Sequence, residues 1–274
     1  MIADIANPYN LCMADEPFIL RSDSPAIATL TLNRPKQFNA LSSAMLAAFQ
    51  AELDAIKGDG TVRVVVIAAQ GRAFCAGHDL KELQAHRSRQ FYDDLFAQCS
   101  RVMLTINTMP QPVIAKVQGI ATAAGCQLVA QCDLAIAADT AEFATSGIRY
   151  GLFCSTPSVT VARNMGRKQA FEMLLTGDFI SAQTAAREGL INKAVPQEQL
   201  DAEVQRLCDA IRRKPQVAVV TGKGMFYRQL EMGLEAAYAL AGDAMACNLM
   251  HADAQEGVLA FTEKRAPMWH SAGA

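Results

Sequence analysis

The 274-residue sequence has no long apolar run, no excess of basic residues and no closely spaced cysteine pair. Its most apolar stretch, residues 113–138, is interrupted by lysine, glutamine and aspartate, so we expect no membrane-spanning helix. A net charge of −2 provides no basic face for nucleic acid, and we expect no nucleic-acid partner. The eight cysteines fit neither a zinc knuckle nor a redox motif, so the sequence predicts no metal site.

The first residues also lack the features of a targeting signal. Residues 1–17 are acidic and have neither a basic n-region nor an Arg-rich amphipathic pattern, so we expect a poorly ordered leader instead of a signal or transit peptide. Several cysteines lie in apolar runs, where a thiol packs as a small core group. Scattered free thiols are typical of a reducing compartment. The sequence therefore predicts a cytoplasmic protein.

Apolar residues are plentiful, at 51% of the chain, which is enough for a large core. In the first two thirds of the chain, strand-like apolar runs alternate with segments of helical spacing. The predicted strands are 26–32, 62–69, 113–117 and 134–138, and the predicted helices are 39–56, 89–107 and 126–131. From Pro196 onward the pattern is almost wholly helical, at 198–213, 215–229, 233–247 and 254–263.

This pattern predicts an α/β core at residues 18–195 and a helical region at residues 196–274. All-helical tails often cover a sister subunit, so we expect an oligomer.

Two segments place small residues where a buried strand runs into a helix. They are Gly71–Leu83 and Val117–Leu128. Small side chains let a ligand approach backbone N–H groups closely, and the first N–H groups of a helix carry partial positive charge. If the two turns face each other, they can hold an oxygen that becomes negative during a reaction. Packing at a strand-to-helix turn is the simpler explanation of either segment alone.

Both segments belong to a series of blocks that resembles the enoyl-CoA hydratase/isomerase (crotonase) superfamily. The blocks are LNRPKQFNAL at 32–41, GRAFCAGHDLKEL at 71–83, VQGIATAAGCQLVAQCDLAIAA at 117–138, FATSGIRYGLFCSTP at 143–157, LTGDFISAQTAAREGLINKAV at 175–195 and EGVLAFTEKR at 256–265. They cover most of the chain, in order. The strings AGHDLKEL, TAAGCQL and GLFCSTP are most similar to the branch called enoyl-CoA hydratase domain-containing protein 3.

The resemblance implies a spiral of ββα units with a helical C-terminal trimerisation region, assembled as a homotrimer or a hexamer. It implies an acyl-CoA thioester as the ligand, with coenzyme A as part of the substrate and no tightly bound cofactor. The backbone N–H groups of His78 and Ala124 would form the oxyanion hole. The family usually has glycine at the second of these positions, and alanine is acceptable there if its φ is negative. The loop Ala73-Phe74-Cys75-Ala76 would take the adenine through backbone contacts.

Charged side chains would hold the phosphates of coenzyme A. The resemblance offers Lys36 and Lys81 within one subunit, and Lys264 or Arg265 from a neighbouring subunit. Solvated surface charge is an equally good explanation of all four.

The two catalytic glutamates of the family are absent. In a hydratase, one carboxylate deprotonates the water and the other delivers a proton to Cα. The resemblance places Gln127 and Gly147 at these positions, and neither side chain exchanges protons near neutral pH. We therefore expect very slow hydration of crotonyl-CoA, since each such group contributes a factor of roughly 10²–10⁴. If nothing else is missing, Gln127→Glu with Gly147→Glu should restore hydration, provided that the new side chains fit.

Neighbouring residues offer other chemistry. Some members of the superfamily have an aspartate at the position of Ser155, so Cys154 and Ser155 are candidates for a nucleophile or a hydrogen-bond donor. A nucleophile needs a base, and His86 is a candidate partner of Cys154, although a surface histidine and a buried cysteine are the simpler interpretation. Three hypotheses stay open. They are an acyl-CoA enzyme of fatty-acid or acyl-CoA metabolism that stabilises an enolate, a slow hydratase whose Gln127 holds the water, and a non-catalytic acyl-CoA binding or scaffold protein.

Overall fold

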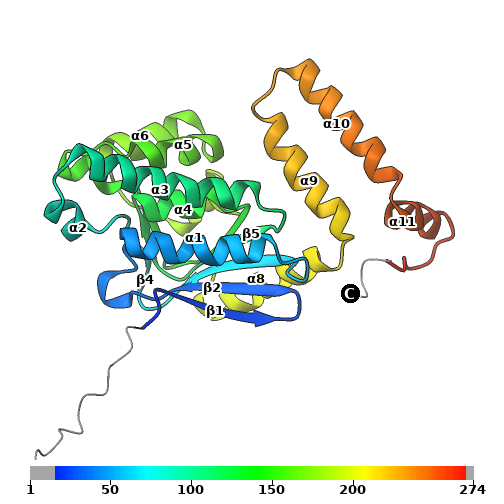
Figure 1. Ribbon diagram of the computed structural model, residues 1–274, viewed down its shortest axis with the longest axis horizontal. Coiled ribbons are helices and arrows are strands. Elements are labelled where there is room, and N and C mark those ends of the chain that lie inside the picture. Colours follow the sequence, from blue (N-terminus) through cyan, green and yellow to red (C-terminus); the bar gives the residue numbers. More distant parts are fainter. Residues whose placement is uncertain (1–15, 270–274) are drawn as a thin grey trace, which may run out of the picture.

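The computed structural model describes residues 16–269 and consists of a mixed α/β core from which the last helices project (Figure 1). The strands are β1 (Ile19–Ser24), β2 (Ile27–Leu32), β3 (Val64–Ala69), β4 (Ala73–Cys75), β5 (Val113–Val117), β6 (Ile120–Thr122), β7 (Leu134–Ala138), β8 (Glu142–Ala144), β9 (Ile180–Ser181) and β10 (Lys193–Val195). One sheet has the order β1-β2-β3-β5-β7-β10, and the other has the order β4-β6-β8-β9. The predicted leader lies outside the described residues, apart from its last two positions.

The α-helices are α1 (Ser43–Lys57), α2 (Leu80–Ala85), α3 (Arg89–Thr108), α4 (Ala124–Gln131), α5 (Ser155–Asn164), α6 (Arg167–Thr176), α7 (Ala182–Arg187), α8 (Leu200–Arg212), α9 (Gln216–Gln229), α10 (Leu234–Leu249) and α11 (Ala252–Thr262). Three short 3-10 helices complete the set: η1 (Pro35–Gln37), η2 (Ser146–Tyr150) and η3 (Gln197–Gln199).

Successive units of two strands and a helical segment form a spiral. β3 and β4 precede α2 and α3, β5 and β6 precede α4, and β7 and β8 precede η2 and α5. The first strand of each unit joins the large sheet in parallel, and the second joins the small sheet. The short loop between the two strands therefore carries the chain from one sheet to the other. The predicted spiral of ββα units is confirmed.

Most predicted elements agree with the structure, because long apolar runs specify them. β3 reads VVVIAA and is almost wholly buried, as expected for a parallel strand in the middle of a covered sheet. The predicted helix at 39–56 starts later, at Ser43, because the Ser42 side chain accepts a hydrogen bond from Met45 N and caps it. The three-residue strands β4, β6 and β8 were not predicted, since so short a strand shows too little alternation.

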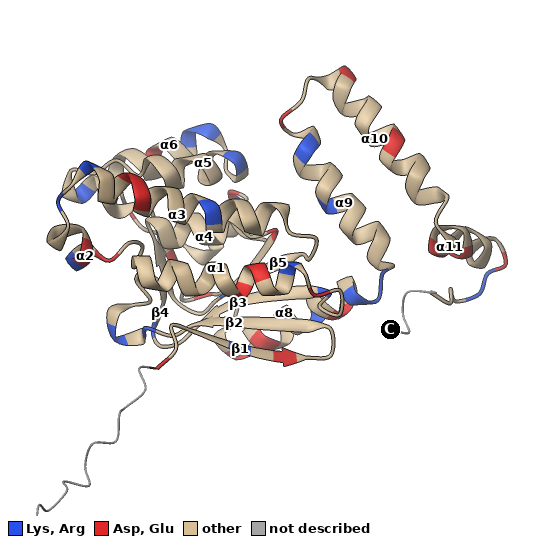
Figure 2. Cartoon of the chain, viewed as in Figure 1, with Lys and Arg blue, Asp and Glu red and all other residues tan. Residues whose placement is uncertain are grey.

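The C-terminal helices divide into two groups. α8 packs on the large sheet through Leu200, Val204 and Cys208. α9 and α10 instead form a helical hairpin that projects from the core (Figure 1), and most of α10 carries no charged residue (Figure 2). Among the described residues, no helix is long and apolar enough to cross a membrane.

A buried ionic cluster ties this hairpin to the core. Lys223 Nζ on α9 contacts Asp133 Oδ2 at 2.7 Å and also donates to the carbonyls of Ile106 and Gln111. Tyr227, one turn further along α9, donates to Asp133 Oδ1 at 2.7 Å. Burial lowers the pKa of Lys223, and the Asp133 carboxylate opposes that effect. Asp133 directly precedes β7, so α9 is bound where the small-residue helix α4 leads back into the large sheet.

Candidate functional site

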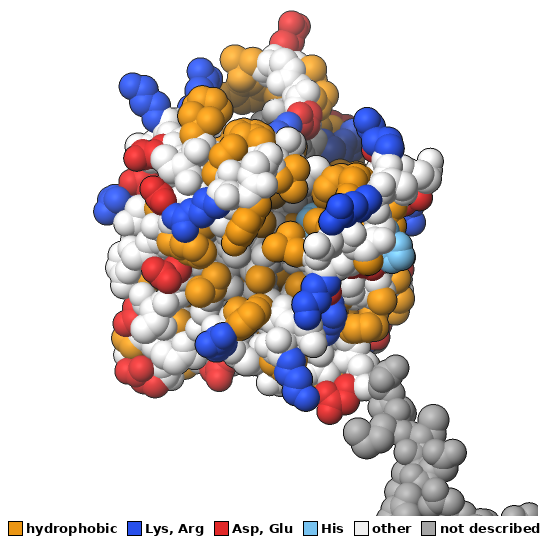
Figure 3. Space-filling model, turned by 90° about the vertical axis from the view of Figure 1, so that its left-hand side faces the viewer, with side chains coloured by type: hydrophobic (Ala, Val, Ile, Leu, Met, Phe, Trp, Pro, Cys, Tyr) orange, Lys and Arg blue, Asp and Glu red, His pale blue; other side chains and the backbone are white. Residues whose placement is uncertain are grey.

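A cavity of about 340 Å³ lies among the loops that end the spiral units. Its wall comes from the α2 segment, α3, the start of α4, and the segment from η2 to α5. The apolar side chains that line it include Leu80, Leu83, Phe96, Leu152, Phe153 and Pro157. Among residues 16–269, no aspartate or glutamate lines this cavity. Hydrophobic side chains also gather on the face of the molecule at the α2 and α6 end (Figure 3).

Two backbone turns touch at the cavity wall. Gly77 has a φ of +92°, and a Cβ placed on it would lie 3.2 Å from Ala124 N and 2.9 Å from Ala123 Cβ. Leu41 N donates to Gly77 O at 2.8 Å and holds the turn from the other side. Within the described residues, neither His78 N nor Ala124 N donates to a carbonyl. The structure thus brings together the two N–H groups that the sequence singled out.

The turn that carries His78 is fixed by charged groups. Asp79 caps α2 by accepting from Lys81 N at 3.0 Å, and its other carboxylate oxygen pairs with Arg34 at 3.1 Å. Glu82 on α2 accepts from Ser43 N, the first N–H of α1, at 3.0 Å. These contacts favour one position for the loop before α2, which carries the His78 N–H.

The backbone strain at the site falls one residue before the expected position. Ala124 begins α4 and does not have a positive φ, which meets the condition set for alanine there. Ala123 has φ 52° and ψ −121°, a conformation that side-chain-bearing residues rarely adopt. Such a residue costs of order 1–3 kcal/mol and persists only where the surrounding structure imposes it. At Gly125, which follows Ala124, a Cβ would clash with the Cys75 carbonyl oxygen.

The side chain of His78 is a buried, neutral imidazole. Burial lowers its pKa to about 4, and its Nε2 has no hydrogen-bond partner in the described structure. The ring packs edge-on against Phe96, with centroids 5.3 Å apart. At neutral pH it therefore adds no charge to an apolar cavity.

The positions of the two missing carboxylates differ in their surroundings. Gln127 is 3% exposed, its Oε1 has no partner, and it is not among the residues that line the cavity. Gly147 does line it, but a Cβ there would lie 2.6 Å from Leu152 O and 2.7 Å from Cys154 Sγ. The Cys154 sulfur thus occupies the space that a side chain at position 147 would need. A glutamate at position 147 therefore does not fit, so the condition set for restoring hydration is not met there.

The other candidate groups lie around the same segment. Cys154 and Ser155 line the cavity, and burial raises the pKa of the Cys154 thiol, so it is held in its unreactive protonated form. Ser155 Oγ donates weakly to Phe153 O at 3.4 Å. His86 ends α2, stacks on Phe91 with centroids 4.9 Å apart, and is not part of the cavity lining.

The predicted coenzyme A residues lie in different settings. Ala73 and Cys75 are buried, and the Ala73 carbonyl accepts from Asn39 and Gln118, while Ala76 lines the cavity. Lys36 and Lys81 are exposed. Lys264 follows α11, which lies at the opposite end of the molecule from α2 (Figure 1). One chain therefore does not bring Lys264 near the cavity. Arg265 is engaged by Glu256 at 2.6 Å.

Sequence reasoning missed most of the cavity wall. Phe96 was assigned only to a helix, and Leu83, Tyr150 and Leu152 appeared only within the blocks of the resemblance, yet all four line the cavity. Helical spacing places Phe96 on the face of α3 that turns toward α2, but only the fold reveals that this face borders a cavity. Thr122 and Ser146 also line it and share a hydrogen bond of 2.7 Å.

Comparison with known proteins agrees with this geometry. Residues 22–272 match the sequence profile of the enoyl-CoA hydratase/isomerase family. The chain is 47% identical over 243 residues to enoyl-CoA hydratase domain-containing protein 3 of Mus musculus, covering 89% of this chain and 81% of that protein. An enoyl-CoA hydratase structure from Mycobacterium smegmatis is 57% identical with a TM-score of 0.92, and covers 93% of this chain and 100% of its own. The human domain-containing protein 3 structure is 45% identical with a TM-score of 0.89 and the same coverage.

The same relatives correct one prediction. The proteins from Mus musculus, Rattus norvegicus and Homo sapiens are each named mitochondrial. The predicted cytoplasmic location is therefore wrong. It rested partly on unpaired cysteines, and the seven that the structure describes are indeed free thiols. Free thiols require a reducing environment, but they do not single out the cytosol.

The profile match spans most of the chain, and the fold agrees with that of the related structures. The protein belongs to the enoyl-CoA hydratase/isomerase (crotonase) family, in the branch of enoyl-CoA hydratase domain-containing protein 3.

Proposed function

We propose that this protein binds an acyl-CoA thioester and polarises its carbonyl in an oxyanion hole formed by His78 N and Ala124 N. The observation that carries the proposal is the close packing of the turn at Gly77 against Ala124 N beside an apolar cavity, together with the absence, among the described residues, of a carbonyl that accepts from either N–H group. Hydrogen bonds from such groups are stronger to the negative oxygen of an enolate than to the neutral carbonyl. Coenzyme A enters as part of the substrate, and no tightly bound cofactor is invoked.

Efficient hydration is not part of this proposal. Water must lose a proton and Cα must gain one, but among the described residues no carboxylate lines the cavity. The His78 imidazole has no partner to orient it, and the Cys154 thiol has a raised pKa. The site thus favours acyl-CoA chemistry that relies on stabilising an enolate, with hydration of crotonyl-CoA very slow. Gln127 holding the water is the weaker alternative, because its side chain is outside the cavity lining.

A spectroscopic titration tests the oxyanion hole separately from binding. A conjugated enoyl-CoA should show a red-shifted thioester absorbance when bound, because the two N–H groups withdraw electrons through the carbonyl. Calorimetry should give far tighter binding of acyl-CoA than of the free fatty acid. Binding without any shift would favour the rival function, a non-catalytic acyl-CoA binding or scaffold protein. Equal affinity for both ligands would overturn the proposal itself.

We further propose a homotrimer or hexamer assembled through α9, α10 and α11. Large apolar side chains on these helices are exposed in the single chain, including Leu234 at 76%, Tyr238 at 72% and Phe261 at 84%. An exposed apolar surface of this kind marks a protein interface. Assembly would also let Lys264 approach a phosphate bound to a neighbouring subunit. Sedimentation at micromolar concentration should give a trimer or larger species, and a monomer would contradict the proposal.

A further inference from the structure

A second and larger cavity, of about 750 Å³, lies where α8 meets α9. Its wall comes from the β1–β2 turn, the loop before β3, the link between α8 and α9, and the segment that ends at Trp269. It shares no lining residue with the acyl cavity. In Figure 1 the start of α9 lies at the opposite end of the core from α2. Its volume falls in the range of small-molecule sites, about 300–1,000 Å³.

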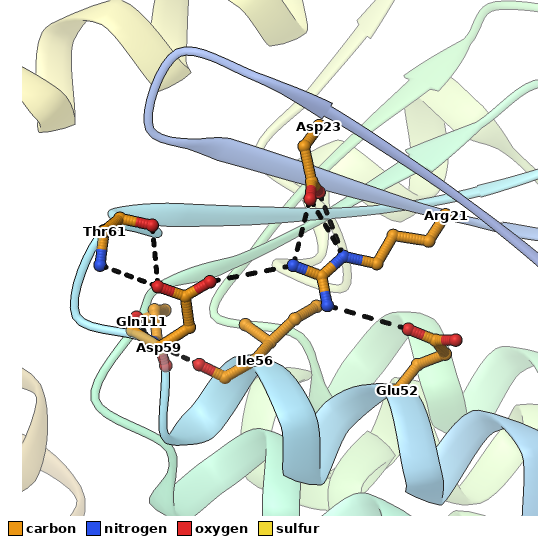
Figure 4. A network of polar contacts seen from close by, with 7 residues as sticks. All are labelled: Arg21, Asp23, Glu52, Ile56, Asp59, Thr61 and Gln111. Carbon is orange, nitrogen blue, oxygen red and sulfur yellow. Dashed lines mark hydrogen bonds and ion pairs between the residues drawn. The ribbon is translucent and has the colours of Figure 1, made fainter.

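The walls of this cavity are linked by hydrogen bonds. An Arg63 guanidinium nitrogen donates to Lys214 O at 2.7 Å, and Gln216 Nε2 donates to Gly60 O at 3.3 Å. The loop before β3 is held from behind as well, since Asp59 accepts from both Thr61 N and Thr61 Oγ1 (Figure 4). The cavity is thus formed by segments that are far apart in sequence and fixed to one another.

Positive charge surrounds the cavity. Arg63, Arg212, Arg213 and Lys214 line it, and among the described residues no aspartate or glutamate does. The nearby carboxylates pair at close range with other cations, although the charge of Arg213 also helps to lower the pKa of Asp209. Asp209 binds Arg212 at 2.7 Å, and Asp59 faces Arg21 at 3.8 Å on the far side of its loop (Figure 4). The negative charge of Asp253 acts on Arg63 and opposes the effect of burial, which lowers the pKa of that guanidinium. Arg213 and Lys214 have no ion-pair partner within residues 16–269, in a chain whose net charge is −2.

An indole ring is held in the same cavity. Trp269 Nε1 donates to Arg213 O at 2.9 Å. The far edge of the ring rests against α11 at Gly257, where a Cβ would lie 3.3 Å from the ring carbons. The ring is therefore fixed at both edges while its residue lines the cavity. A fixed aromatic ring beside unpaired cations matches a ligand with a planar base and several negative charges.

We propose that this cavity binds a nucleoside polyphosphate, with the phosphates on Arg213 and Lys214 and the base against Trp269. Arginine and lysine bind phosphate oxygens through charge-assisted hydrogen bonds, and a concave cluster of cations raises the local concentration of anions. The acyl cavity, by contrast, is lined mainly by apolar side chains. The proposed nucleotide site is thus separate from the proposed acyl-CoA site and does not depend on it.

The chain has a single tryptophan, so its fluorescence reports on this cavity alone. The full-length protein is titrated with adenosine diphosphate, inorganic pyrophosphate and adenosine. We expect saturable quenching by the nucleotide, weaker binding of pyrophosphate, and little response to adenosine. Arg213→Gln with Lys214→Gln should weaken nucleotide binding by about tenfold or more, because each removes a charge-assisted contact while the Arg213 carbonyl that holds Trp269 stays.

Arg167→Gln with Lys168→Gln removes the same pair of neighbouring charges from the exposed start of α6 and serves as the matched control. This control should leave nucleotide affinity unchanged, and both double variants should bind crotonyl-CoA like the parent. The proposal is overturned if the nucleotide does not bind, or if the two double variants lose affinity equally. Loss of crotonyl-CoA binding in the Arg213 and Lys214 variant would also overturn it, because the two sites would then not be separate.

Discussion

Replacing the two missing carboxylates should not produce a fast hydratase, because position 147 has no room for a side chain. A Cβ on Gly147 would lie 2.6 Å from Leu152 O and 2.7 Å from Cys154 Sγ, whereas ordinary contacts begin at 3.4 Å. One of the two clashing atoms belongs to the backbone, and Leu152 N is itself bonded to Gly147 O at 3.1 Å. A side chain therefore fits only if the whole turn from η2 to α5 moves.

The expected cost follows from overpacking, which destabilises a core by about 1–3 kcal/mol. At about 2–4 °C per kcal/mol for a chain of this size, Gly147→Ala should lower Tm by about 2–12 °C. Gly58→Ala is the matched control, since Gly58 has φ −85° and the nearest atom to its Cβ would lie 4.0 Å away. That control should raise stability by about 0.4–1 kcal/mol, because alanine restricts the unfolded chain.

Hydration of crotonyl-CoA, followed by loss of the enoyl thioester absorbance, completes the test. Gln127→Glu with Gly147→Glu should hydrate no faster than the parent chain and should melt at a lower temperature. Gln127→Glu alone separates the effect of the new buried acid from the effect of the clash. A double variant that is as stable as the parent and about 10²-fold faster would refute the steric reasoning.

Three further predictions concern Ala123, the ionic cluster of Lys223 and Asp133, and His78. Ala123→Gly should raise the free energy of unfolding by about 1 kcal/mol, because relief of the positive φ outweighs the greater flexibility of the unfolded chain. Urea unfolding should show a higher midpoint, and a lower midpoint would contradict this. Lys223→Met should lower the free energy of unfolding by about 3–5 kcal/mol, because the Asp133 carboxylate stays buried without its cation. Tyr227→Phe should lower it by only about 1–3 kcal/mol, since it removes one hydrogen bond to Asp133. Equal losses of stability in urea unfolding would contradict the role given to the Lys223–Asp133 ion pair. The folded pKa of His78, about 4, lies below the ordinary 6.5, so the unfolded chain binds the extra proton between these values and stability falls as pH drops through that window. His78→Leu should remove that loss, which amounts to at most about 3 kcal/mol, and identical stability profiles at pH 4–7 would contradict the assignment.

The sequence predicted the two small-residue turns because local features specify them. Gly77 and Gly125 permit close backbone contact, and each lies within about ten residues of a buried apolar strand, β3 or β5, that sequence patterns reveal. The charged contacts that hold the loop, such as Arg34 with Asp79, join residues 45 apart and leave no local pattern. The same is true of Lys223 with Asp133, which are 90 residues apart. Such pairs become visible only when the fold brings them together.

The replacement at position 147 shows a different limit of sequence reasoning. A glycine where the resemblance places a catalytic glutamate suggests an empty space, and an empty space suggests that an acid can be introduced there. The structure contradicts this, since Cys154 and Leu152 fill the space from seven and five positions further along the chain. A glutamate at 147 and the observed Cys154 position therefore exclude each other sterically.

The remaining chemistry can be weighed by magnitude. Each lost acid or base removes a factor of roughly 10²–10⁴, while one oxyanion-hole donor is worth about 10²–10³. The proposed oxyanion hole needs only the backbone N–H groups of His78 and Ala124, so the proposed stabilisation of an enolate would not depend on general acid–base groups. An apolar cavity also strengthens these two hydrogen bonds, because little water competes for the oxygen. The proposed site would therefore suit reactions in which the substrate or the solvent supplies the base, and it would suit hydration, which must move two protons, least.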